Sequence, residues 1–413
     1  MDTGTRPPPE DHTAGTAAGS GARTIRAVHM FVAASLISLI GTWTERIALG
    51  WLAWTLTGST FWTGFVSMAV LLPAALFGPF VAVFAEGWNV RKAMLLSNAC
   101  FASVSMVLFL LVATETITLE LLVFLALLIG VIGAAMHPVR LTFLPMIAPR
   151  DYLPRAVALS AISFNASRVI GPAVAGLLIT TSGLSWTFFI NTLSYLPVVI
   201  LVAVLPMGAR PVKAAGRTRL GAGLVDGLRY AVSRPLIRWS LLMAAANGFL
   251  VRGIVENMPA VVGGLFDGSP ADLTWMTSSA GLGSVAGAAL IGWLKSDAPQ
   301  LRRMLPVFPF AGAVFALLFA AGLSFEVDVA VAAALGFVAT FVGIGSQIIV
   351  QLEVEDTHRA RVMTWWSSAS FAAVSLSGLI VGAIGDLVSM SHAIAGLGLF
   401  GLAIAAAFVF RRG

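Results

Sequence analysis

Five charged side chains lie inside long apolar stretches of this sequence: Glu45, Arg46, Arg168, Arg252 and Glu256. A charge near the centre of a lipid bilayer costs about 2.5–3.5 kcal/mol on insertion scales, so several in one chain need partners and usually mark a pathway. Arg252 and Glu256 are spaced i, i+4 and can pair on one helix face. Glu45 and Arg46 project about 100° apart on a helix, so we do not expect them to pair with each other.

Two uncharged side chains share helical faces with these arginines. Trp43 lies three residues before Arg46, and a ring beside a cation in a cavity would hold an amphipathic molecule. Asn165 lies one turn before Arg168 on the same face. The sequence therefore indicates that Trp43 and Asn165 belong to the same substrate pathway as the buried arginines.

A proton could move through this pathway on Glu45 or on Glu256, because burial beside an arginine sets the proton affinity of a carboxyl group. We expect one of these two residues to gain and lose a proton during the working cycle. The residues alone leave a second interpretation open. The arginines could instead be fixed ion pairs that join packed helices, or they could reach toward the membrane surface.

The elements that position these charges are apolar enough to have lipid as their solvent. Hydrophobic residues make up 58% of the 413 residues and charged residues 11%, against roughly a quarter charged in a soluble domain. The formal net charge of +6 does not indicate nucleic acid, because the basic residues occupy short loops instead of one face. The single cysteine, Cys100, excludes a disulfide within the chain, and we expect no metal site.

Twelve long apolar runs follow one another, six on each side of Pro206. Each is near or above the roughly 20 residues that a helix needs to cross a bilayer, and lipid favours helices because their backbone groups are satisfied internally. The fold class predicted is therefore an all-α integral membrane protein with twelve transmembrane helices. The runs cover residues 28–56, 60–85, 92–113, 119–136, 156–180, 184–205, 237–262, 272–294, 304–323, 328–351, 362–384 and 391–410.

An internal repeat divides these helices into two sets of six. A shift by the distance from Arg155 to Arg361 places the stretch after Arg155 on the stretch after Arg361, and it also places Arg46 on Arg252. We predict four segments from this repeat and from the composition of the rest. They are a disordered cytoplasmic tail (1–24), a first six-helix bundle (25–205), a cytoplasmic linker with an amphipathic helix (206–236) and a second bundle (237–413).

The basic residues lie in alternate loops, whereas the loops between them contain Asp and Glu but neither Lys nor Arg. By the positive-inside rule, the loops rich in Lys and Arg face the cytoplasm, and so do both termini. The first apolar run lacks a convincing signal-peptidase site, so we expect it to remain in the membrane. We therefore expect a multi-pass protein of a bacterial inner membrane.

Four stretches carry a resemblance to a known family: RIALGWLAWTLTGS from Arg46, LPRAVALSAISFNASRVIGPAVAGLL from Leu153, FFINTLSYL from Phe188 and DGLRYAVSRPLIRWSLL from Asp226. They resemble the major facilitator superfamily, in the branch of bacterial enterobactin exporters and macrolide efflux proteins. The resemblance implies two six-helix repeats that rock about a substrate cavity near the membrane midplane.

The resemblance also implies a cytoplasmic gate at the loop AVFAEGWNVRK, from Ala82 to Lys92. Family members have an acid near the end of one helix and a basic pair at the start of the next. Here Glu86 stands for the acid and Arg91 with Lys92 for the basic pair, while Ala82 and Gly87 depart from the family pattern. These charges would lock the gate, or would anchor the loop at lipid headgroups.

Gly171 and Pro172 resemble a Gly-Pro-x-x-Gly element of exporters in the same superfamily. Pro172 lacks an N–H and crowds the carbonyl of Arg168, so we expect a hinge there. Gly171 and Gly176 allow close approach of a neighbouring helix. A packing kink without directional meaning is the alternative, but the resemblance favours export.

The function predicted is a secondary active transporter, not an enzyme, that exports an amphipathic small molecule of the drug or siderophore class. We expect proton antiport with alternating access, no cofactor beyond the proton gradient, and a monomer in the lipid bilayer. Three alternatives remain: a transporter of lysophospholipid or another lipid, a small-molecule importer, and a membrane scaffold or receptor that transports nothing.

Overall fold

The computed structural model describes residues 12–84, 88–205, 220–266, 268–294 and 298–410, and these contain helices and no strand. The all-α fold is therefore confirmed for the described part of the chain. The helices of the first half are α1 (His12–Thr57), α2 (Thr60–Phe84), α3 (Val90–Ala113), α4 (Leu119–Ile147), α5 (Leu153–Thr181), α6 (Ser185–Ser194) and α7 (Leu196–Val204). Those that follow are α8 (Leu220–Ser233), α9 (Pro235–Asn247), the π-helix η1 (Gly248–Arg252), α10 (Gly253–Glu256), α11 (Met258–Phe266), α12 (Pro270–Trp293), α13 (Ala298–Met304), α14 (Val307–Ala320), α15 (Phe325–Glu353), α16 (Asp356–Leu387) and α17 (Met390–Phe410).

Each of the twelve predicted runs coincides with helix in the described residues. In the part of the chain that the structure describes, eight helices are long and apolar enough to cross a membrane, or nine if the bent pair is one span. The other three are α12, α14 and α17. The first has 24 residues with many Gly, Ser and Thr, the second has 14, and the third is apolar over Met390–Ile404. With its 14 residues, α14 is shorter than a full crossing requires.

The seventh predicted span is the bent one. Its two parts, Pro235–Glu256 and Met258–Phe266, meet at an angle of 64°. Pro259 offers no backbone N–H just after the bend, and Asn257 ends the first part with its N–H directed to the carbonyls of Gly253 and Ile254. A π-helical turn, η1, precedes the bend and ends at Arg252. Such turns are frequent at functional sites.

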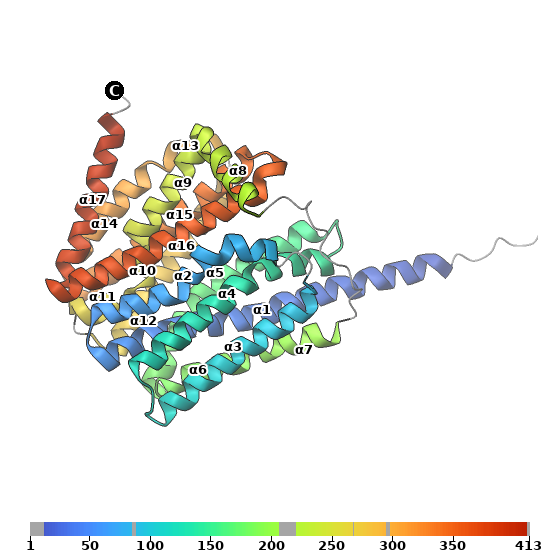
Figure 1. Ribbon diagram of the computed structural model, residues 1–413, viewed down its shortest axis with the longest axis horizontal. Helices are drawn as coiled ribbons and strands as arrows, with labels where there is room; N and C mark the ends of the chain where they lie inside the picture. The colour runs from blue at the N-terminus through green and yellow to red at the C-terminus, as the bar shows by residue number, and fades with distance from the viewer. Residues whose placement is uncertain (1–11, 85–87, 206–219, 267, 295–297, 411–413) are drawn as a thin grey trace, which may run out of the picture.

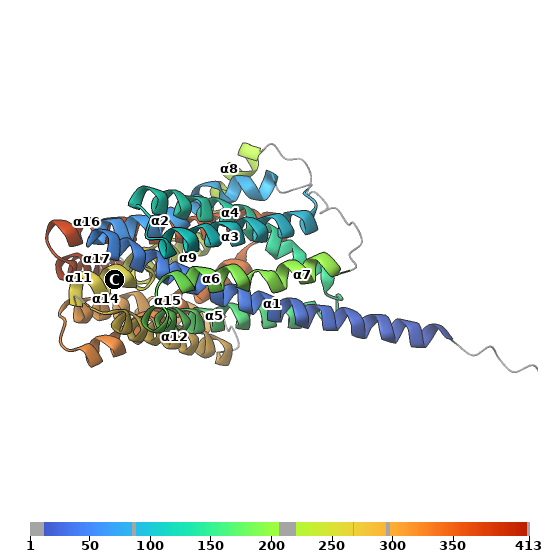
Figure 2. The ribbon, with the colours of Figure 1, turned by 90° about the horizontal axis from the view of Figure 1, so that it is seen from below.

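The two halves of the chain meet along two pairs of helices. α2 of the first half packs along α16 of the second, and α5 packs along α12. Figure 1 shows α16 lying along α2, whereas α17 runs at a steep angle to α1. Figure 2, seen from below, shows α1 extending beyond the other helices.

The contacts between the halves are reciprocal. In the first half, Gly176 of α5 lies against Thr274 of α12. In the second half, Gly382, its partner under the internal repeat, lies against the backbone of Thr60 on α2. A side chain at either glycine would overlap the facing helix, so both positions require the smallest residue. Two repeats related by a twofold axis are expected to exchange contacts in this way.

The predicted disordered tail covers residues 1–24. Residues 1–11 lie outside the described part, but α1 begins at His12 and its apolar span begins at Thr24. No proline follows Pro9 in this segment, so nothing in it blocks continuation of the helix toward the N-terminus.

The linker contains the predicted amphipathic helix as α8, while residues 206–219 lie outside the described part. Asp226 of α8 pairs with Arg361 of α16 at 2.8 Å, which ties the helix to the second half. Leu228 and Val232, from the predicted apolar stripe, remain 38% and 47% exposed. An apolar face directed away from the protein suits a helix on a membrane surface.

A substitution at Gly64 tests how closely α2 of the first half must approach α16 of the second. A Cβ at Gly64 of α2 would overlap the backbone carbonyl of Gly378 on α16, and backbone atoms cannot turn aside. We expect Gly64→Ala to lower the stability of the purified protein in detergent by about 1–3 kcal/mol, the range for overpacking. The measurement is the thermal unfolding midpoint.

Gly78 on the same helix is the matched control, because a Cβ there meets nothing within 4 Å. Gly78→Ala is expected to leave the unfolding midpoint unchanged or slightly raised, since alanine favours helix over glycine. Equal midpoints for the two variants would contradict the close packing of α2 on α16.

Candidate functional site

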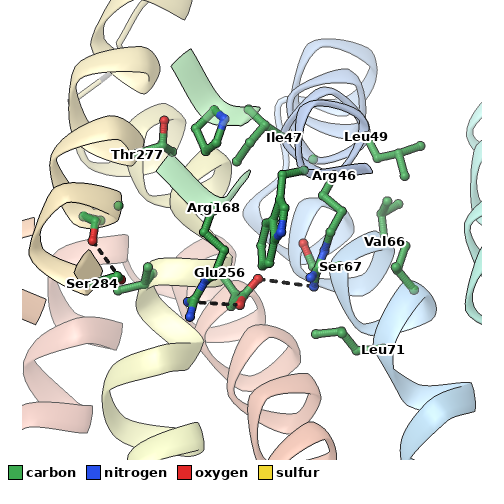
Figure 3. A pocket seen from close by; sticks show the side chains of 17 residues that line it. Arg46, Ile47, Leu49, Val66, Ser67, Leu71, Arg168, Glu256, Thr277 and Ser284 are labelled. Atoms are coloured by element: carbon green, nitrogen blue, oxygen red, sulfur yellow. Dashed lines mark hydrogen bonds and ion pairs between the residues drawn. The ribbon is translucent and has the colours of Figure 1, made fainter. Parts of the chain in front are cut away.

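Glu256 lies at the centre of a buried ionic cluster between the two halves. Its carboxylate is 3.2 Å from Arg46 Nη2, 3.2 Å from Arg252 Nε and 4.0 Å from Arg168 Nη2. The glutamate side chain is only 6% exposed. Figure 3 shows Arg46 and Arg168 approaching it from different helices. The predicted Arg252–Glu256 pair is confirmed, and the structure adds two arginines from the first half.

Close contact between α1 and α5 brings Arg46 and Arg168 together. A Cβ at Gly171 of α5 would overlap the Cβ of Trp43 on α1, so only glycine allows this approach. Thr44 of α1 donates a hydrogen bond to the Gly171 carbonyl at 3.0 Å, which fixes the same contact. The predicted close approach at Gly171 is confirmed. α5 nevertheless continues from Leu153 to Thr181 with Pro172 inside it.

Trp43 links the two arginines of the first half. The guanidinium carbon of Arg46 lies 4.7 Å from the centre of the Trp43 ring, and that of Arg168 lies 5.3 Å from it. Both distances are within the range of cation–π attraction. One aromatic ring therefore holds two like charges that would otherwise repel each other.

A small cavity opens beside this cluster. Its volume is about 50 Å³, room for a few water molecules. Both halves contribute to its wall, which is mostly apolar apart from the charged groups and three hydroxyls. The lining residues are Trp43, Arg46, Ile47, Leu49, Gly50, Val66, Ser67, Val70, Leu71, Arg168, Pro172, Val255, Glu256, Thr277, Ala280, Gly281 and Ser284.

Glu45 lies in a separate place, inside the first half. Asn191 Nδ2 donates to Glu45 Oε2 at 2.7 Å, and the Ser105 hydroxyl donates to the same oxygen. Asn191 also lies 3.4 Å from the Tyr195 hydroxyl, which is 3.3 Å from the Thr42 hydroxyl. Glu45 is 3% exposed and does not line the cavity. As predicted, it does not pair with Arg46.

Sequence reasoning missed the partners of Glu45. Ser105 and Asn191 are common polar residues in apolar runs, and their positions relative to Glu45 depend on how α6 packs against α1 and α3. The one available signal was Asn191, because the side-chain amide of an asparagine inside a membrane span needs a hydrogen-bonding partner.

The remaining predicted residues lie away from the cluster. Asn165 donates to the Ala161 carbonyl of its own helix at 2.9 Å and does not line the cavity. Of the predicted gate, Glu86 lies outside the described residues. Arg91 donates to the Ala203 carbonyl of α7, and the Lys92 backbone N–H donates to the side-chain oxygen of Asn89 at 3.1 Å, which caps α3. These contacts hold the start of α3 in place.

A family model described as a transmembrane secretion effector, MFS_3, matches residues 23–412, nearly the whole chain. The chain belongs to this family of the major facilitator superfamily. The resemblance found in the sequence and the predicted fold class are thereby confirmed. The same comparison makes the protein a membrane transporter by family and not an enzyme.

Known relatives are similar at low identity. The multidrug efflux pump Tap of Mycolicibacterium fortuitum is 23% identical over 91% of this chain and 93% of its own. The enterobactin exporter EntS of Shigella boydii serotype 18 is 22% identical over 62% of this chain and 61% of its own. A crystal structure of a mutant nucleoside transporter, NupG, has a TM-score of 0.74 at 12% identity, covering 93% of this chain and 99% of that one. This last likeness shows the fold alone.

A contact that the sequence did not indicate joins the halves of this transporter at one end of the bundle. Asp386 of α16 accepts hydrogen bonds from the Thr60 backbone N–H at 2.7 Å and from the Thr60 hydroxyl at 2.8 Å. The Ser59 hydroxyl also donates to it. A carboxylate from the second half therefore caps the first turn of α2 in the first half, where negative charge is favourable.

Asp386→Asn should weaken this end of the junction. An amide keeps the shape but loses the charge, and a hydrogen bond to a charged group contributes about 1.5–3 kcal/mol. We expect longer distances between spin labels at Glu120 and Val327, which stand on opposite halves near this end. Double electron–electron resonance would measure them.

Asp272→Asn is the control, because Asp272 caps α12 through Ser269 within the second half alone. That substitution removes a carboxylate charge without touching the contact between Asp386 and Thr60, so its distance distribution should match the unsubstituted protein. The same distribution in both variants would contradict a latch at Asp386.

Proposed function

We propose that this protein is a secondary active transporter that exports an amphipathic small molecule by alternating access. The observation that carries the proposal is the cavity with its ionic cluster at the junction of the two halves. Arg46 and Arg168 come from the first half and Glu256 from the second. Relative motion of the halves would therefore change the cavity and break or make the ion pairs.

The described contacts support a conformation in which the two halves are closed against each other at one end of their junction. Asp386 with Thr60, and Gly176 with Thr274, join the halves near the loops that lack Lys and Arg. By the positive-inside rule we place that end outside the cell. On this proposal the conformation described is closed to the outside, and substrate enters the cavity from the cytoplasm.

Export as the direction draws support from the printed functions of two relatives, a multidrug efflux pump and an enterobactin exporter. We place the protein in a bacterial inner membrane with both termini in the cytoplasm, on the distribution of basic loops. We propose further that it acts as a monomer and uses the proton gradient with no cofactor. The Gly171–Pro172 element would allow α5 to bend as the cycle proceeds.

We propose Glu45 as the proton carrier. Among the described residues its hydrogen-bond partners are neutral, so it can exchange a proton without breaking an ion pair. Glu256 is less suited to this role, because losing its charge would leave three guanidinium groups without a counter-ion.

Efflux assays test this proposal in a strain that lacks the gene, with and without complementation. A panel of drugs and siderophores identifies a substrate, and a protonophore should abolish its outward transport. Failure of complementation to change the efflux of any compound would contradict the proposed function. Full efflux in the presence of the protonophore would contradict proton coupling.

Glu45→Gln tests the proton carrier. We expect this variant to lose concentrative efflux and to retain exchange of labelled for unlabelled substrate, because a neutral amide cannot carry a proton but still accepts its hydrogen bonds. Glu120→Gln is the matched control, since Glu120 is an exposed carboxylate at the start of α4. If only Glu256→Gln uncouples transport, the proton carrier is Glu256.

A further inference from the structure

The ionic cluster carries an excess of positive charge. Arg46, Arg168 and Arg252 share one carboxylate, so the four side chains have a net charge of +2. Within the described lining of the cavity, Glu256 is the only acid. Glu45, the nearest acid in sequence, makes its hydrogen bonds elsewhere in the first half. Uncompensated charge at this depth is costly, so a further anion would be stabilised here.

Arg168 has the least complete set of partners. Its ion pair with Glu256 is 4.0 Å long, beyond hydrogen-bond distance, and it makes no hydrogen bond to another described residue. Its side chain is nevertheless only 12% exposed. A guanidinium has five N–H donors in a fixed planar arrangement that suits a carboxylate or phosphate. Arg168 is part of the lining of the cavity, so an anionic group that enters the cavity comes close to its guanidinium group.

The surroundings of Arg168 also restrict what carries the anionic group. Trp43 presents a ring beside both guanidinium groups, and the rest of the wall is formed mainly by aliphatic residues. Figure 3 shows Ile47, Val66 and Leu71 around the charged residues. Flat or aromatic bodies stack on such surfaces, whereas a strongly hydrated ion such as free phosphate would lose its water without replacement.

We propose that the cavity binds a small organic anion with an aromatic or apolar body, whose anionic group lies between Arg46 and Arg168. This inference rests on the proposed transport function and specifies its substrate class. A volume of about 50 Å³ accepts the anionic group in the conformation described, and the body requires the cavity to widen as the halves move. Cationic molecules of the same shape are excluded by the net charge of +2.

Equilibrium binding to the full-length protein in phosphatidylcholine nanodiscs tests the proposal. The probes are two xanthene dyes of similar shape, anionic fluorescein and cationic tetramethylrhodamine methyl ester, followed by fluorescence anisotropy. We expect fluorescein to bind at least about tenfold more tightly, which corresponds to about 1.4 kcal/mol. Tighter binding of the cationic dye would overturn the proposal.

Three substitutions make the assignment specific. Arg168→Gln should weaken fluorescein binding about tenfold or more, because one of its charged partners is lost. Glu256→Gln should strengthen it, since the net charge rises, whereas a cation site would respond in the opposite direction. Arg168→Lys, which keeps the charge but not the planar donors, should lie between the wild type and Arg168→Gln. Thermal unfolding confirms that each variant is folded.

Arg303→Gln is the matched control, because Arg303 is exposed on α13 and distant from the cavity lining. It should leave fluorescein binding unchanged. Equal affinities for Arg168→Gln and Arg303→Gln would overturn the proposal. A nanodisc series with added phosphatidylglycerol separates a lipid headgroup from a free organic anion. If the anionic lipid displaces fluorescein at a low mole fraction, the site binds lipid and the proposal fails.

The outcome for the substrate class is separate from the outcome for transport. If fluorescein binds as expected but complementation exports no compound, the proposed function fails while the anion site stands. If the exported compounds are all cationic, and they neither displace fluorescein nor depend on Arg168 for export, the transport function stands and the anion site fails.

Discussion

One carboxylate shared among three arginines is the interaction on which the ionic cluster and its cavity depend. Glu256 is the only described counter-ion for Arg46, Arg168 and Arg252, which come from three different spans and both halves of the chain. Removing one partner of a buried ion pair leaves an uncompensated charge, which is strongly destabilising. The four side chains of this cluster are therefore held close together. On the proposed mechanism, motion between the halves would rearrange these ion pairs.

The packing that permits this cluster depends on small residues at defined positions. Gly171 lets α5 approach Trp43 on α1, and Gly176 lets the same helix approach α12 of the other half. Gly382 provides the equivalent contact for α16 on α2. In lipid there is no hydrophobic driving force between helices, so close packing between small residues supplies much of the association energy.

The two buried glutamates have different surroundings and suit different roles. Glu45 receives hydrogen bonds from neutral groups inside the first half, while Glu256 is held by cations at the junction. A transporter that separates its proton site from its substrate site can couple them through the position of α1, which carries both Glu45 and Arg46. On the proposed mechanism, coupling and recognition lie one residue apart in sequence but on different faces of one helix.

The sequence by itself determined the fold class, the positions of the helices and the identity of the costly charges, because lipid requires long apolar helices and tolerates few ions. It also determined the Arg252–Glu256 pair, since an i, i+4 spacing fixes neighbours on one helix. Only the tertiary structure decided that Arg46 and Arg168 join this pair, that Glu45 does not, and that Asp386 caps α2. Those contacts join residues that are far apart along the chain. Which residues meet depends on how the helices are rotated and how closely they approach each other. Small residues set that approach, but they leave no distinctive pattern in the sequence.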